Sequence, residues 1–297
     1  MAVGEYPLPE MRKRVWQPRT LAEAWQLKRT LGEQAVIVSG GTLLRTQWEA
    51  GTAIMPGHLI SLESVPELQV CEAGGAAIRI GAGVTLAACQ RWGDAPSLLK
   101  EACRRIAAPS IRRLGTIGGN VMSASGDSLP ALAVTDAELV WYDGSGSVAE
   151  PIGAWLEQRR ANGGSAKETR LLKEVRWSRK ADDQEACGYY EKVGRREGFC
   201  PSVVTVAGQF RLDAAGRLRG VRLAAGSAAA VACRLAEAEA LLEGSVWSAD
   251  LRRSVHQAVM EGFDSGADAF ATAAYRKRAA AHLLAAFLEE RAGCRGD

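Results

Sequence analysis

Residues 111–120 read Ile-Arg-Arg-Leu-Gly-Thr-Ile-Gly-Gly-Asn, and residues 36–42 read Val-Ile-Val-Ser-Gly-Gly-Thr. Each stretch ends in paired glycines beside a small hydroxyl residue. Glycine has no side chain, so its backbone N–H groups approach an anion closely. One glycine pair is typical of an ordinary turn, but two such loops in one chain predict a clamp around a diphosphate.

A third glycine segment lies between these loops, at Gly81-Ala82-Gly83. It begins like a dinucleotide-binding fingerprint, but Leu86 stands at the sixth position, where that fingerprint has glycine or alanine. Glu101, about 20 residues further on, falls in a predicted helix instead of at a strand end. The segment therefore argues against a Rossmann fold.

The composition is that of an ordinary globular protein. A length of 297 residues predicts two or three subdomains that share one site. A net charge of +3 is too small to indicate nucleic-acid binding, and neither a secretory signal nor a membrane-spanning run is apparent. We therefore expect a cytoplasmic protein. The seven cysteines and three histidines show no iron–sulfur or metal-ligand spacing, so no metal site is expected.

Hydrophobic periodicity predicts α/β organisation up to about residue 178, followed by a β hairpin and helices. A capping box at Thr20 and Glu23 begins the first helix. The expected helices and strands lie at 21–31, 35–38, 59–62, 77–80, 85–92 and 98–106, with a hairpin at 203–223. Residues 228–295 are rich in alanine, leucine, glutamate and arginine, and we expect them to be mainly helical.

Around its glycine loops the chain resembles the FAD-binding subunit of the xanthine dehydrogenase and carbon monoxide dehydrogenase group of molybdenum hydroxylases. Residues 40–44 are similar to the family's first flavin diphosphate loop, and residues 106–120 are similar to its second. Residues 78–83 lie between these loops, and residues 190–196 follow them, in the family's order. The resemblance extends over nearly the whole chain.

The resemblance implies an α+β protein with an FAD-binding fold of the vanillyl-alcohol-oxidase or PCMH type. This domain would comprise residues 1–180, in two α/β subdomains at about 1–57 and 58–180. A small α+β C-terminal domain, an antiparallel sheet packed by helices, would comprise residues 181–297.

The resemblance also implies which residues bind FAD. Two groups would line the pyrophosphate and ribityl chain: Ser39, Gly40, Gly41, Thr42, Leu43 and Leu44 from the first loop, and Thr116, Ile117, Gly118, Gly119 and Asn120 from the second. Four further residues would contact other parts of the cofactor: Ile106 near the isoalloxazine, Asp127 at the sugar region, Leu172 or its neighbour Leu171 near the adenine, and Lys192 at the polar edge of the ring.

Simpler roles exist for three of these residues. Asp127 is also placed to cap a helix that begins near Ser128. Lys192, taken alone, is typical of a solvated lysine, and Ile106 belongs to a helical apolar stripe that is core in either case. The two interpretations remain side by side for Asp127 and Lys192.

The resemblance implies an electron-transfer flavoprotein, an FAD-dependent oxidoreductase subunit. A large partner would carry molybdopterin, a small partner would carry a 2Fe-2S centre, and FAD here would pass electrons to NAD or another acceptor. The substrate would be a purine, as in xanthine dehydrogenase, with carbon monoxide, nicotinate-like heterocycles and aldehydes left open. The sequence contains no GxSxG motif and no histidine acid–base pair, so no catalytic residue is expected.

Two other functions remain open. One is a stand-alone FAD-dependent oxidoreductase of the same fold, which would need its own substrate pocket and would turn over without partners. The other is a non-enzymatic nucleotide-binding assembly protein, in which the glycine loops hold a ligand without a redox step. Reduction of bound flavin by NADH separates the enzymatic functions from the last.

Overall fold

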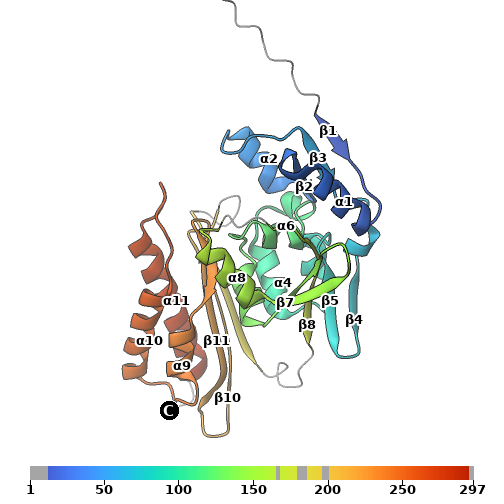
Figure 1. The fold of residues 1–297 in the computed structure, drawn as a ribbon. Coiled ribbons are helices and arrows are strands. Elements are labelled where there is room, and N and C mark those ends of the chain that lie inside the picture. The colour runs from blue at the N-terminus through green and yellow to red at the C-terminus, as the bar shows by residue number, and fades with distance from the viewer. Residues whose placement is uncertain (1–12, 165–167, 179–185, 196–200, 294–297) are drawn as a thin grey trace, which may run out of the picture.

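The computed structural model describes residues 13–164, 168–178, 186–195 and 201–293. Three β-sheets organise them, with strand orders β1-β3-β2, β4-β5-β8-β6-β7 and β12-β11-β10-β9. In Figure 1 the first sheet sits above the second, and the third lies beside the second with its helices on the outer side. This mixed architecture confirms the α+β class and the C-terminal antiparallel sheet packed by helices.

The first sheet is parallel and small. It contains β1 (Arg14–Trp16), β2 (Ala35–Val38) and β3 (His58–Ser61), accompanied by α1 (Leu21–Leu31), η1 (Gly32–Gln34), α2 (Thr42–Glu49) and η2 (Pro66–Leu68). The capping box is confirmed, because Thr20 Oγ1 accepts from the amide of Glu23 at 3.1 Å. β3 pairs with β1 and β2, so the first sheet extends a few residues past the subdomain boundary expected near residue 57.

The second sheet is antiparallel throughout. Its strands are β4 (Cys71–Gly74), β5 (Ala77–Gly81), β6 (Glu138–Tyr142), β7 (Ser147–Pro151) and β8 (Leu171–Ser178). Its helices are α3 (Leu86–Arg91), α4 (Ser97–Arg105), α5 (Pro109–Arg112), α6 (Ile117–Met122), α7 (Leu129–Val134) and α8 (Ile152–Ala161). One large apolar cluster joins these elements to α1.

The third sheet has its own apolar core beneath its helices. Its strands are β9 (Cys187–Val193), β10 (Val204–Leu212), β11 (Leu218–Ser227) and β12 (Ala230–Arg234), and its helices are α9 (Ala236–Leu242), α10 (Ala249–Gly262) and α11 (Ala273–Ala292). The hairpin is confirmed by the pairing of β10 with β11. The prediction that residues 228–295 are mainly helical missed β12, which pairs with the far side of β11. The expected domain boundary at residue 180 lies outside the described residues.

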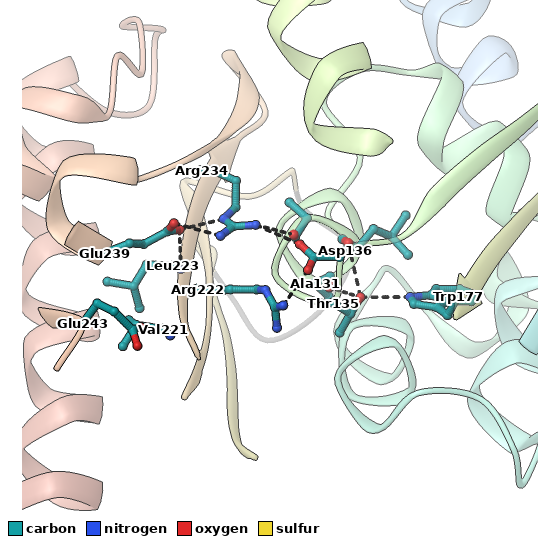
Figure 2. A network of polar contacts seen from close by, with 12 residues as sticks. Ala131, Thr135, Asp136, Trp177, Val221, Arg222, Leu223, Arg234, Glu239 and Glu243 are labelled. Carbon is teal, nitrogen blue, oxygen red and sulfur yellow. Dashed lines mark hydrogen bonds and ion pairs between the residues drawn. The ribbon is translucent and has the colours of Figure 1, made fainter. Parts of the chain in front are cut away.

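Helix α7 forms much of the contact between the helices of the second sheet and the third sheet. All six of its residues are buried, and it packs on β10, β11 and β12. Asp136 follows α7 in a left-handed conformation (φ +49°) and pairs with Arg222 at 2.6 Å and Arg234 at 3.1 Å. Arg234 also pairs with Glu239 at 2.6 Å. Figure 2 shows the two arginines of the C-terminal sheet pointing at this one carboxylate.

Candidate functional site

The first glycine loop leads from β2 into α2. Gly41 adopts φ +64°, a conformation that glycine reaches without strain, and it is the N-cap of α2. No side chain caps this helix. The backbone N–H groups of its first turn, from Thr42 to Leu44, are those that a helix cannot satisfy internally, and they form a place for an anion.

The second glycine loop leads into α6 and uses its amides differently. Thr116 Oγ1 accepts from the amide of Gly119 at 3.1 Å. The amides of Ile117 and Gly118 both donate at 2.9 Å, to the carbonyls of Val84 and Ala82 respectively. These three amides are therefore engaged within the protein, which differs from the expectation that both loops offer free N–H groups.

Glycine at position 118 serves close backbone packing. A Cβ there would stand 2.6 Å from the carbonyl oxygen of Ala82 and 2.7 Å from the Cβ of that residue. The Gly81-Ala82-Gly83 segment does not match a dinucleotide fingerprint, and the second glycine loop packs against it.

The two glycine loops touch each other. A Cβ on Gly40 would stand 2.6 Å from the carbonyl carbon of Leu114 and 2.8 Å from the Cα of Gly115. A Cβ on Gly115 would in turn stand 3.4 Å from Thr42 Oγ1. Segments far apart in the sequence therefore meet backbone to backbone, and this approach requires a residue without a side chain at position 40.

Asn120 organises the loop that follows α6. Its Oδ1 accepts from the amide of Ser128 at 3.1 Å and from the Ser128 hydroxyl at 2.5 Å. Gly126 packs closely against Asn120, since a Cβ there would lie 2.7 Å from the Asn120 Cγ. The asparagine thereby fixes the segment that carries Asp127.

Asp127 and Lys192 are brought together from two domains. Asp127 Oδ2 lies 2.7 Å from Lys192 Nζ, and their side chains are only 13% and 6% exposed. The Tyr190 hydroxyl donates to the Asp127 carbonyl at 2.8 Å, and burial raises the pKa of Tyr190 well above its ordinary value. Lys192 is therefore not a solvated lysine. Asp127 does not cap α7 either, because the N-cap is Ser128 and no side chain caps this helix.

Ile106 and Leu172 are both buried. Ile106 ends α4 and is 6% exposed, and the next residue, Ala107, has φ +45°. Leu172 lies in β8, which packs against α6, and is 5% exposed. The structure thus places Ile106 beside a turn with a left-handed residue, Ala107, and Leu172 in the core of the second sheet.

Three contacts around these residues were not predicted from the sequence. Arg112 donates to the carbonyls of Ile106 and Ala107, Tyr190 bonds to the Asp127 backbone, and Arg105 of α4 forms an ion pair with Glu191. Arg112 and Tyr190 belong to the motif blocks that carry the family resemblance, and this is the one signal that points to them. Their partners are set by tertiary packing.

The described residues hold no group of three or more histidine, cysteine, aspartate or glutamate side chains able to bind a metal ion. Within the same ranges, no helix is long and apolar enough to cross a membrane.

Comparison with known families matches both domains. Residues 10–177 match the FAD binding domain in molybdopterin dehydrogenase, and residues 188–291 match the CO dehydrogenase flavoprotein C-terminal domain. These two matches abut the residues between β8 and β9, where the sheets change.

Two curated relatives carry related names. The carbon monoxide dehydrogenase medium chain of Hydrogenophaga pseudoflava is 33% identical over 121 residues, 39% of this chain and 42% of that protein. The nicotinate dehydrogenase FAD-subunit of Eubacterium barkeri is 27% identical over 241 residues, 77% of this chain and 78% of that protein. The first match therefore spans less than half of the relative's length.

Solved structures share the fold along nearly the whole chain. A carbon monoxide dehydrogenase from Hydrogenophaga pseudoflava superposes with a TM-score of 0.84 at 24% identity, covering 96% of this chain and 98% of that one. Quinoline 2-oxidoreductase from Pseudomonas putida 86 gives a TM-score of 0.81 at 19% identity, covering 95% and 97%.

Proposed function

This chain belongs to the family of FAD binding domains in molybdopterin dehydrogenases, and from that premise we propose that it is the electron-transfer flavoprotein subunit of a molybdenum hydroxylase. The observation that carries the proposal is the backbone contact between Gly40 and the Leu114–Gly115 segment. It brings together the two loops that the family uses to hold one diphosphate.

The residues present fit FAD. The uncapped first turn of α2 offers amides to a phosphate, and the glycines beside it leave the approach open. In the second loop the engaged amides hold the shape of the loop, so its contribution is a rigid wall. We assign phosphate binding mainly to residues 40–44 and the support of the diphosphate and ribityl chain to residues 116–120.

Lys192 supplies positive charge to this site from the C-terminal domain. Its ammonium group is buried against Asp127, and a fixed charge in a poorly solvated place acts more strongly than one in water. We propose that Asp127 orients Lys192 toward the polar edge of the flavin ring. Bound FAD supplies the chemistry of exchanging electrons singly with an iron–sulfur centre and in pairs with a hydride acceptor.

We further propose partners of the kind that the family implies. A molybdopterin-binding large subunit would hydroxylate the substrate, a small 2Fe-2S subunit would conduct electrons, and NAD or another acceptor would receive them. For the substrate we propose a purine or a related nitrogen heterocycle, in a xanthine dehydrogenase-like complex. The nicotinate dehydrogenase relative, aligned over 77% of this chain, supports a heterocycle.

The test is to purify the chain alone and together with the products of its two neighbouring reading frames. We expect stoichiometric FAD in the chain, identified by release and chromatography, and anaerobic bleaching by NADH or by the substrate of the complex. A chain that carries no flavin in either preparation refutes the proposal. Bound flavin that no donor reduces favours the non-enzymatic function, and turnover without partners favours the stand-alone oxidoreductase.

A further inference from the structure

The turn between α4 and α5 has an unusual backbone. Ala107 adopts φ +45°, in the left-handed region that residues with a Cβ enter at a cost in energy. The chain is constrained on both sides of it. Ile106 ends α4, and Ala108 is held extended (φ −81°, ψ 158°) because Pro109 follows. An alanine in this conformation persists only where its surroundings hold it there.

Arg112 provides that hold. Its Nη1 donates to the Ile106 carbonyl at 2.9 Å and to the Ala107 carbonyl at 2.7 Å. One guanidinium nitrogen thus bridges the two carbonyls that flank the left-handed step. Hydrogen bonds from a charged donor are among the stronger ones in proteins, so this pair offsets the strain at Ala107.

The short helix α5, which carries Arg112, connects this turn to the glycine loops. The Ile111 carbonyl accepts from the amides of Leu114 at 3.1 Å and Gly115 at 2.7 Å. Leu114 and Gly115 are the residues that contact Gly40. The turn, α5 and both glycine loops are therefore joined by direct contacts, with Arg112 as the link at one end.

We propose that Arg112 is a positioning residue of the flavin site. By holding Ala107 in the left-handed conformation, it fixes the Ile106–Ala107 turn relative to the two glycine loops, so that the turn forms a defined wall for the isoalloxazine. This inference rests on the proposed function, and it assigns to Arg112 no contact with the cofactor itself.

The experiment compares variants in the full chain purified as the holoprotein. Arg112→Met removes both hydrogen bonds, whereas Arg112→Lys retains a charged donor. Arg278→Met removes an exposed arginine of α11, outside both glycine loops, and is the matched control. The measurements are FAD affinity, the circular dichroism of the flavin bands and the flavin midpoint potential, with thermal unfolding followed separately.

We expect Arg112→Met to weaken FAD binding by about fivefold to a hundredfold and to shift the flavin bands and potential. Arg112→Lys should restore most of the affinity, and Arg278→Met should match the wild type. Unchanged affinity and spectrum in Arg112→Met overturns the inference. A wild-type chain without FAD instead overturns the proposed function, so the two failures are distinguishable.

A double variant keeps the test valid if Arg112→Met folds poorly. Glycine adopts φ +45° without a Cβ clash, so Ala107→Gly removes the strain that Arg112 offsets. Adding Ala107→Gly to Arg112→Met should bring FAD affinity and the flavin bands back toward the wild type. A double variant no better than Arg112→Met contradicts the role assigned to Arg112.

Discussion

The contact between the glycine loops makes Gly40→Ala the sharpest perturbation of the site. The added Cβ would overlap the Leu114 carbonyl oxygen and stand 2.6 Å from the Leu114 carbonyl carbon, 0.8 Å short of the 3.4 Å at which ordinary van der Waals contact begins. Both opposing atoms are backbone, so no side chain can rotate away and the loops must separate. Overpacking of this kind costs about 1–3 kcal/mol. If the separation is taken up in the binding site, FAD affinity falls by about fivefold to 150-fold.

Titration of the apoprotein with FAD, followed by flavin fluorescence, measures this loss. The matched control is Gly153→Ala in α8, where an added Cβ meets nothing within 4 Å. Alanine also favours the helix there by about 0.5–1 kcal/mol, so the control should bind FAD normally and melt no lower than the wild type. Wild-type FAD affinity and stability in Gly40→Ala would refute the inferred backbone contact, because the loops would then have room for a methyl group.

Three further changes test ion pairs, two of them between the domains and one within α4. Lys192→Met leaves the Asp127 carboxylate buried without its partner, and we expect a loss of about 3–5 kcal/mol in denaturant unfolding; adding Asp127→Asn should recover much of it, and an equally unstable double variant would contradict the pairing. Asp136→Asn keeps a side chain that tolerates φ +49° but removes the charge facing two arginines; because these groups are partly exposed, a loss of about 1 kcal/mol is expected, and no loss would show that the pairs contribute nothing. Hydrogen bonds from Arg104 lower the pKa of Glu101 to about 2. The ionised Glu101 therefore stabilises the folded state at pH values above its unfolded pKa, and this stabilisation is lost as the pH falls toward 2. Glu101→Gln should flatten the acid dependence of the unfolding midpoint, and an unchanged profile would count against this role of Glu101.

Local sequence signals were sufficient for much of the fold. The Thr20 and Glu23 capping box and the apolar stripe behind it predicted α1 from residue 21 to 31, as observed. The turn at 213–216 between two β-rich runs predicted the β10–β11 hairpin. These features are determined by residues close to one another in the sequence, so the sequence alone is sufficient to predict them.

Other features depend on partners that the sequence does not reveal. β12 forms because an alanine-rich segment finds a free edge of β11, and composition alone favours a helix for such a segment. The paired glycines at 118 and 119 suggested free amides, but the amide of Gly118 donates to Ala82, which lies 36 residues earlier in the chain. The family resemblance pointed to Asp127 and Lys192, and only the tertiary structure shows that they contact each other.

The short helix α7 has an aspartate at each end, and both form ion pairs with the C-terminal sheet. Asp127 precedes it and Asp136 follows it, and each pairs with a cation from the C-terminal sheet. A domain held by one contact can rotate about it, whereas ion pairs at both ends of the buried helix α7 prevent this rotation. The C-terminal sheet is therefore expected to move with the flavin domain as one unit, so that any partner docked on one of them keeps a constant distance to the other.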